Sequence, residues 1–222
     1  MRKTALIPFS GRAGMNDTAA GVPAARSLIA TAAVLVVLLT SSLAYADDFI
    51  GLTYDMAVPG GKLGDYLGEA SWRGFTFEGR RGFGEMWSVG VSLNYNVFHE
   101  TTDEMIALES QDISGTQFRV VYCLPLLATA HYYFNWDYYQ AVEPYVGIGV
   151  GGYRIERRLD IGVYSITDKN WHFGLAPEAG LVVPFDFQTS FYFNVKYNYA
   201  LGTAGIGPYS YWGFNIGMAW RQ

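Results

Sequence analysis

Charged side chains recur at alternate positions inside apolar, glycine-rich stretches of this sequence, and ion pairing is the chemistry open to them there. Isolated charges are costly to bury, whereas opposite charges that share a narrow interior pair with one another. The pattern therefore predicts a salt-bridge network, with a gated pore in which the pairs exchange as the alternative interpretation. The residues predicted for the network are Asp55, Glu78, Arg80, Arg119, Glu178 and Lys196, and His131 and His172 occupy the same faces of their runs.

Catalytic chemistry has weaker support. Nucleophilic hydrolysis needs a hydroxyl, an imidazole and a carboxylate in contact, and Ser71, Ser88 and Ser92 have no obvious histidine partner at strand-neighbour spacing. The single cysteine excludes an internal disulfide framework, a four-cysteine zinc site and a CxxC redox motif. The acidic segment His99–Thr116 lacks the spacing of a calcium-binding EF-hand loop, so a solvated loop is expected there. We predict no catalytic residue, no cofactor and no metal site.

The composition is that of a membrane protein, although spanning helices are missing. Half of the 222 residues are hydrophobic and 17% are aromatic. Charged residues reach 16%, where soluble chains carry about 25%. The net charge of -5 argues against binding to nucleic acid. Only one segment approaches the length of a spanning helix, and it lies near the amino terminus.

That segment has the features of a secretory signal peptide. Arg26 precedes the apolar run Ser27–Leu39, and Ala44-Tyr45-Ala46 forms a small-x-small cleavage site. We therefore predict a signal peptide over residues 1–46, cleaved after Ala46, and a mature domain over residues 47–222. An uncleaved anchor is the alternative, and translation from Met15 instead of Met1 stays open. Because the signal peptide carries four basic residues and one acidic residue, the mature domain has a net charge of -8.

An exported chain without further apolar helices can cross a membrane only as a closed β-barrel, which satisfies every backbone hydrogen-bonding group. The signature of such a barrel is strict alternation of apolar and polar residues over about ten positions. We predict eight strands in an antiparallel, up-and-down, all-β transmembrane barrel. The clearest runs are Met86–Phe98, Ser190–Tyr199 and Tyr211–Trp220, and the weaker ones are Asp48–Val58, Ser71–Arg80, Gln117–Phe134, Pro144–Ile155 and Trp171–Val183.

Two prolines interrupt these runs. Proline cannot donate a ladder hydrogen bond, so we expect a bulge or kink at Pro125 and at Pro177; Pro125 as a turn is the alternative. Connectors between runs alternate in length, which predicts short periplasmic turns, long outer loops and a periplasmic amino terminus. The expected long loops are Pro59–Ala70, His99–Thr116, Arg157–Asn170 and Ala200–Ser210.

The bulky side chains fall on the face opposite the charges, which is inverted relative to a soluble barrel with an apolar core. An ordinary apolar stripe of a soluble barrel is the alternative. We also expect Arg154, Arg157 and Arg158 to contact lipid headgroup phosphates, to which arginine is well suited, although a plain surface cluster is an equal alternative. The predicted aromatic girdles at the membrane boundaries comprise Tyr54, Trp87, Trp171, Tyr199, Trp212 and Trp220.

Three stretches carry a resemblance to a known family. They are Glu143–Gly151 (EPYVGIGVG), Tyr132–Phe134 (YYF) and Asn194–Tyr197 (NVKY). Through them the chain resembles the small outer-membrane β-barrel domain proteins of the opacity and OmpX kind. The resemblance implies an eight-stranded barrel in the cell outer membrane and says little about activity, because the family is diverse.

The expected function is that of a structural or interaction scaffold that displays extracellular loops, for adhesion, envelope integrity or host interaction. A small gated pore for ions or solutes is the alternative, followed by a lipopolysaccharide-modifying enzyme and a secreted, soluble lipocalin-like barrel. The expected partners are outer-membrane lipid and lipopolysaccharide, the barrel assembly machinery and an extracellular ligand bound by the loops. We expect a monomer.

Overall fold

The computed structural model describes most of the predicted mature domain. The predicted signal peptide and Met15 lie outside the described residues, so cleavage after Ala46 stays a prediction. The described residues are 48–83, 86–102, 106–108, 111–113, 117–134, 142–161, 164–203 and 207–221.

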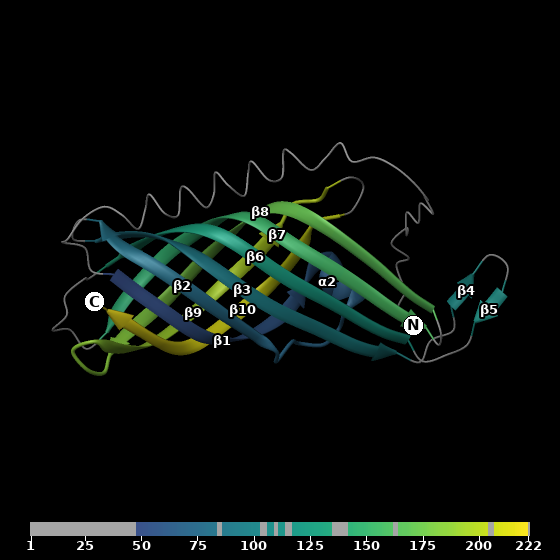
Figure 1. Ribbon diagram of the computed structural model, residues 1–222, viewed down its shortest axis with the longest axis horizontal. Coiled ribbons are helices and arrows are strands. Elements are labelled where there is room, and N and C mark those ends of the chain that lie inside the picture. Colours follow the sequence, from purple (N-terminus) through teal and green to yellow (C-terminus); the bar gives the residue numbers. More distant parts are fainter. Residues whose placement is uncertain are drawn as a thin grey trace. The chain divides into compact units, whose positions relative to one another are not determined.

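Eight antiparallel strands close into a barrel, in the order β1-β10-β9-β8-β7-β6-β3-β2 (Figure 1). Strands adjacent in this order pair throughout, and β1 and β10 complete the ring. The predicted fold class and strand number are therefore confirmed. The wall strands are β1 (Asp48–Gly60), β2 (Gly74–Phe83), β3 (Trp87–Thr102), β6 (Gln117–Tyr133), β7 (Glu143–Ile161), β8 (Tyr164–Pro184), β9 (Thr189–Ala200) and β10 (Tyr209–Arg221).

Three further elements lie between the wall strands. The short helix α2 (Gly61–Tyr66) follows β1, and the strands β4 (Ile106–Leu108) and β5 (Gln111–Ile113) pair with each other between β3 and β6. Within the described residues, no helix is long and apolar enough to span a membrane. Strand β1 begins and strand β10 ends at the same end of the barrel, which is here called the terminal end. The elements α2, β4 and β5 lie toward the opposite end, which is called the loop end (Figure 1).

Alternation along each strand divides the side chains between lumen and exterior. In β1, Thr53 and Asp55 are buried inside the barrel, whereas Leu52 and Tyr54 are exposed on the outside. The same division holds in the other wall strands, so that large apolar side chains cover the exterior and polar ones fill the lumen. The sense of the barrel is thus inverted relative to a soluble one.

We expected a bulge or a kink at each strand proline; the structure excludes a bulge at both positions, and Pro125 is not a turn. Pro125 lies within β6 and Pro177 within β8, and both strands continue without a change of register. Pairing is interrupted on one side only, between Leu93 and Asn96 of β3 opposite Pro125, and opposite Pro177 in β9. A missing N–H therefore removes local ladder bonds here, without inserting an extra residue.

The wall has a tall half and a short half. Strands β3, β6, β7 and β8 contain 16 to 21 residues, whereas β1, β2, β9 and β10 contain 10 to 13. The expected long loop Arg157–Asn170 is wrong, because those residues continue β7 and β8 as a paired hairpin. The outward-facing residues of this segment, such as Arg158 and Lys169, are polar, so no lipid-facing pattern marks it as a strand in the sequence.

Candidate functional site

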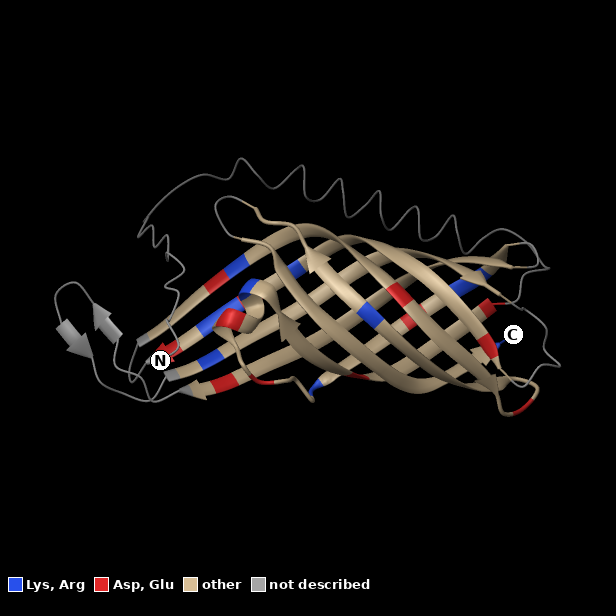
Figure 2. Cartoon of the chain, turned by 180° about the vertical axis from the view of Figure 1, so that it is seen from behind, with Lys and Arg blue, Asp and Glu red and all other residues tan. Residues whose placement is uncertain are grey.

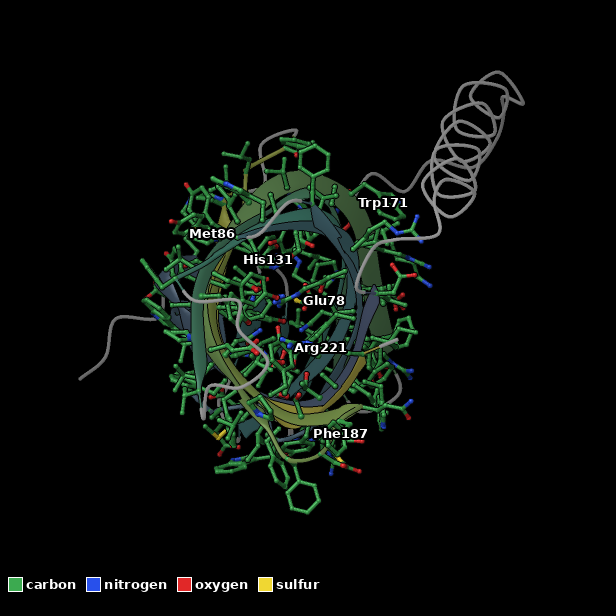
Figure 3. All side chains as sticks on the ribbon, turned by 90° about the vertical axis from the view of Figure 1, so that its left-hand side faces the viewer. Glu78, Met86, His131, Trp171, Phe187 and Arg221 are labelled. Atoms are coloured by element: carbon green, nitrogen blue, oxygen red, sulfur yellow. The ribbon has the colours of Figure 1, made fainter. Side chains whose placement is uncertain are left out.

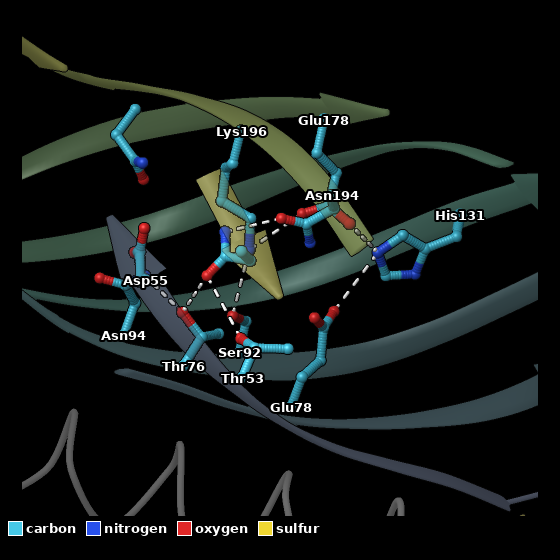
Figure 4. Close-up of polar contacts among 12 residues, drawn as sticks. Thr53, Asp55, Thr76, Glu78, Ser92, Asn94, His131, Glu178, Asn194 and Lys196 are labelled. Atoms are coloured by element: carbon cyan, nitrogen blue, oxygen red, sulfur yellow. Dashed lines mark hydrogen bonds and ion pairs between the residues drawn. The ribbon is translucent and has the colours of Figure 1, made fainter. Parts of the chain in front are cut away.

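An ionic cluster occupies the lumen toward the terminal end, built by inward-facing residues of four strands. Glu178 of β8 forms an ion pair with Lys196 of β9 at 2.9 Å (Oε2 to Nζ) and another with Arg80 of β2 at 3.1 Å (Oε1 to Nη2). Glu78, also on β2, pairs with Arg80 at 3.0 Å. His131 of β6 lies between the two carboxylates, with Nε2 2.9 Å from Glu178 Oε1 and 3.4 Å from Glu78 Oε1. Figure 4 shows the contacts of Glu178 with Lys196 and those of His131 with the two carboxylates.

Tyrosine side chains surround the guanidinium of Arg80. It donates to the hydroxyls of Tyr133 at 2.9 Å and Tyr145 at 3.1 Å, and also to that of Tyr192. Its central carbon lies 4.5 Å from the centroid of the Tyr145 ring, within cation–π range. Because the phenol groups satisfy the donors that the carboxylates leave free, Arg80 is buried without an unpaired charge.

Strand register explains why these residues meet. Glu178 and Lys196 are direct cross-strand partners in β8 and β9, so their side chains share the same inward face. Gly147 of β7 lies between Glu178 on one side and His131 on the other. A Cβ atom at Gly147 would lie 2.3 Å from the His131 ring, so only glycine leaves room for the imidazole at this position.

A layer of amides lies next to the ionic cluster, on its loop-end side. Asp55 Oδ2 accepts hydrogen bonds from Asn94 at 2.5 Å and Asn96 at 2.9 Å. Asn215 accepts from Thr76 at 3.0 Å and donates to a further amide, that of Asn194. The ionic cluster and the amide layer are therefore both connected polar networks, as expected for side chains that fill the narrow interior of an eight-stranded barrel.

The six residues predicted for the lumen network fall into three places. Glu78, Arg80, Glu178 and Lys196 form the ionic cluster. Asp55 belongs to the amide layer. Arg119 lies apart at the loop end, where it donates to the Tyr66 carbonyl oxygen at 3.4 Å and stacks on the Tyr66 ring.

Sequence reasoning missed a contact between a serine and a histidine. Ser88 of β3 and His131 of β6 are direct cross-strand partners, and Ser88 Oγ lies 3.3 Å from His131 Nδ1. With Glu178 on the other ring nitrogen, the three have the order of a nucleophilic triad. Ser88 is fully buried inside the lumen, so the contact completes the polar network rather than presenting a nucleophile. Only the register of β3 against β6 could have revealed it.

Three side chains of the ionic cluster lie close enough together to be compared with a metal site. Glu78, His131 and Glu178 offer three ligand atoms within 4.8 Å of one another. Glu78 already forms an ion pair with Arg80, and Glu178 forms ion pairs with both Arg80 and Lys196. The protein's own cations thus neutralise the acidic groups that a metal ion would need.

Apolar layers close the lumen toward both ends. At the loop end, Leu63 of α2 and Leu67 after it pack against Phe98, Val121 and other wall residues. At the terminal end, Phe49 belongs to a second layer with tyrosine rings. Beyond that layer Arg221 forms an ion pair with Glu143, and Figure 3 shows Arg221, Glu78 and His131 inside the barrel.

The exterior carries a broad apolar surface. Figure 2 shows few charged residues along the middle of the wall strands and more toward the two ends. Trp171 is 61% exposed and Phe187, in the turn after β8, is 82% exposed; Figure 3 shows both side chains pointing away from the barrel. Of the residues predicted for the girdles, Trp87 and Trp220 lie near the terminal end and Trp171 and Trp212 near the loop end, with Tyr54 and Tyr199 also toward the loop end.

The three predicted headgroup arginines do not share one face. Arg157 faces inward, where it forms an ion pair with Asp168 at 2.6 Å and lies over the Tyr209 ring. Arg154 and Arg158 are exposed on the outside of β7, and Arg158 pairs with Asp160 at 2.9 Å. Alternation along β7 separates them, because consecutive residues of a strand face opposite sides.

The comparisons with known proteins agree with this architecture. The sequence model of the outer membrane protein β-barrel domain matches residues 30–221. Among curated proteins, none matches the chain in sequence.

Several solved structures are similar to this chain at low sequence identity. The outer membrane protein OprG from Pseudomonas aeruginosa superposes with a TM-score of 0.55 at 15% identity, over 80% of this chain and 96% of that chain. Neisserial surface protein A gives 0.49 at 14% identity, over 80% and 98%. Ail of Yersinia pestis, crystallised with the heparin analogue sucrose octasulfate, gives 0.44 at 16% identity, over 80% and 97%. At such identities the likeness to OprG shows the fold alone.

Proposed function

The chain belongs to the outer membrane protein β-barrel domain family, and from this premise we propose that it is an interaction scaffold whose barrel anchors a binding surface outside the cell. The family assigns the protein to the outer membrane. The finer role rests on the unequal height of the barrel wall. We propose that the terminal end, where the connections between strands are short, faces the periplasm and that the loop end faces outward.

The observation that carries the proposal is the projection of the tall half. A strand that crosses an outer membrane uses about ten residues, whereas β7 has 19 and β8 has 21. Because β9 pairs with β8 only from Gly174 onward, the loop-end part of β8 has a paired strand on one side only among the described residues. An unpaired strand edge above the membrane can add an extended segment of another protein.

Shortening the hairpin tests this role. Replacing residues 157–168 by a two-residue turn removes most of the projection while leaving the lumen cluster and the β8–β9 pairing in place. Cells that display the shortened variant should adhere less to immobilised extracellular matrix and epithelial cells than cells that display the wild type at equal surface amount. Equal adherence, with heat-modifiability on a gel showing both barrels folded, would contradict the scaffold role.

Lipid contacts form the second part of the proposal. We propose that the aromatic side chains near the two ends serve as membrane girdles and that Arg154 and Arg158 contact lipopolysaccharide phosphates. Arg154 lies opposite Trp171 in the β7–β8 pair, at the loop-end limit of the apolar exterior. Assembly by the barrel assembly machinery and a monomeric state complete the proposal. Native mass spectrometry should show lipopolysaccharide retained by the wild type and lost more readily by Arg154→Gln; equal retention would contradict the contact.

A small pore is the second candidate, favoured by the polar column of the lumen. Polar side chains continue from the ionic cluster through the amide layer to Asn198, which accepts from Tyr153 at 3.2 Å. Conduction would require both apolar layers to open. Recording in planar bilayers tests it: current steps that increase when Leu63 is replaced by glycine support a pore, and silent bilayers for both proteins remove it.

A further inference from the structure

The amide layer holds one negative charge that the ionic cluster does not neutralise. In the ionic cluster Glu78 and Glu178 are matched by Arg80 and Lys196. Glu143 is matched by Arg221 nearer the terminal end. Asp55 is fully buried and forms no ion pair with any described residue. With His131 neutral, the ionic cluster and the amide layer together therefore have an excess charge of one carboxylate, located at Asp55.

One oxygen of this carboxylate faces a small space in the lumen. Asp55 Oδ2 receives two amide hydrogen bonds, whereas Oδ1 accepts no hydrogen bond from a described side chain. Asn198 Nδ2 is buried without a hydrogen-bond partner among the described residues. Both atoms face Gly213 of β10: a Cβ atom there would lie 3.0 Å from Asp55 Oδ1 and 3.6 Å from Asn198 Nδ2. The glycine thus keeps a small space open between these two polar groups.

The amide of Asn198 can present an oxygen to this space. Tyr153 OH lies 3.2 Å from Asn198 Oδ1 and 3.3 Å from the Leu175 carbonyl oxygen. A 180° turn of the amide exchanges its oxygen and nitrogen. Nδ2 then donates to the Tyr153 hydroxyl, which donates to the Leu175 carbonyl, and Oδ1 points toward Asp55. The hydrogen bonds that link Asn198, Tyr153 and Leu175 are all retained after this rotation of the amide.

Two further buried oxygens lie on neighbouring inward positions. Asn96 Oδ1 and the Tyr211 hydroxyl are buried and lie in contact with each other, and Asn96 Oδ1 lies over Gly74 of β2 rather than over Gly213. Asn96 already contacts Asp55 through its amide nitrogen. Tyr211 precedes Gly213 on the same face of β10 and is the cross-strand partner of Asn198. The surroundings of Asp55 therefore combine one carboxylate with neutral oxygens, which are ligands that hard cations prefer.

We propose that Asp55 Oδ1 and the amide oxygen of Asn198 bind a monovalent cation such as Na⁺ inside the barrel, in the space over Gly213. A single positive charge neutralises these two layers, whereas a divalent ion would leave an excess positive charge next to Lys196. The ion also satisfies polar atoms that would otherwise be buried at a cost in free energy. The site lies apart from the projecting hairpin and does not depend on the scaffold role.

Thermal unfolding of the purified barrel in detergent tests the proposal. Exchanging N-methylglucamine chloride for sodium chloride at constant ionic strength should raise the Tm of the wild type by about 5–10 °C, the size expected for an ion well above its Kd. Asp55→Asn and Gly213→Ala should abolish the difference, the first by removing the charge and the second by filling the space. Asp168→Asn, which alters an ion pair near the loop end, should retain it.

Three results would overturn the proposal, and the first two decide between a cation and a proton. One is a wild-type Tm that is the same in both salts. Another is an infrared band of a protonated carboxylic acid that is present in the wild type and absent from Asp55→Asn, because a proton would then neutralise Asp55. If either variant fails to fold, the wild-type salt comparison and the infrared spectrum still make that decision. The third result, stabilisation by Ca²⁺ but not by Na⁺, would contradict a monovalent site.

Discussion

Two regions of the lumen are filled by different chemistry. Toward the loop end, α2 inserts Leu63 and, just after it, Leu67 among apolar wall residues. Toward the terminal end, Arg80 links Glu78 and Glu178 across the barrel. The apolar layer includes a short helix that is not part of the barrel wall, whereas the ionic cluster joins wall strands that are fixed in register. The ionic cluster should therefore determine global stability, and the apolar layer should determine access to the lumen.

Removing Arg80 should produce the largest effect. Arg80→Ala leaves two buried carboxylates facing each other, and the loss of one partner from a buried ion pair typically costs about 3–5 kcal/mol. Urea unfolding in lipid vesicles, followed by the gel shift of the folded barrel, measures the change. The neighbouring Arg81 is the matched control, because its ion pair with Asp48 is partly exposed and such pairs contribute about 0–1 kcal/mol. Equal losses for the two variants would show that the cluster does not dominate stability.

The pair Glu178–Lys196 should show the next largest effect and a measurable coupling. Glu178→Ala and Lys196→Ala should each lower the Tm, because each leaves the other charge buried without its partner at 2.9 Å. A double-mutant cycle with Glu178→Gln and Lys196→Met should give a coupling free energy of about 1–3 kcal/mol. An unchanged Tm for both alanine variants would contradict a stabilising network.

Disturbing the apolar layer at the loop end should change how readily reagents enter the lumen rather than the free energy of unfolding of the barrel. Cys123 is the single cysteine of the chain and is fully buried in this layer. Leu63→Glu should displace α2 and increase the rate at which a bulky maleimide labels Cys123 by at least about tenfold, since local opening by 1.4 kcal/mol corresponds to that factor. Asp65→Ala, an exposed change in the same helix, should leave the rate unchanged. Equal labelling rates for all three proteins would mean that α2 does not close the lumen.

Periodicity predicted the wall because the side-chain period of a strand is local. Runs such as Met86–Phe98 expose one face to lipid and the other to the lumen, and the structure preserves that division. The hairpin continuing β7 and β8 was missed because residues such as Glu156 and Lys169 are polar on its outer face, so no lipid-facing pattern marks it. Register, too, was invisible: the contact of Ser88 with His131 depends on how β3 aligns with β6.

The predicted charge set shows the same limit. Inward orientation could be predicted for each member, but depth along the barrel axis depends on strand tilt and register, which alternation does not encode. Arg119 therefore shares a face with the other charges without sharing their layer. Its partner Tyr66 follows from the folding of α2 into the loop end, a tertiary contact that no local pattern predicted.

Replacing Arg119 should have the smallest effect on the free energy of unfolding. The same variant tests most directly whether the charges at the two ends of the lumen act independently. Arg119→Ala removes a carbonyl contact at 3.4 Å and the stacking on Tyr66, so a loss of about 0.5–1 kcal/mol is expected, as for an exposed cation–π contact. Because Arg119 lies outside the ionic cluster, its effect should add to that of Glu178→Gln within about 0.5 kcal/mol. In the same Glu178→Gln background, the coupling free energy expected for Lys196 is larger. Comparing the two double-mutant cycles therefore measures how independent Arg119 is of the ionic cluster. Non-additivity of Arg119 with Glu178 would mean that the charges of the two ends act as one network, and that the apolar layer does not insulate them.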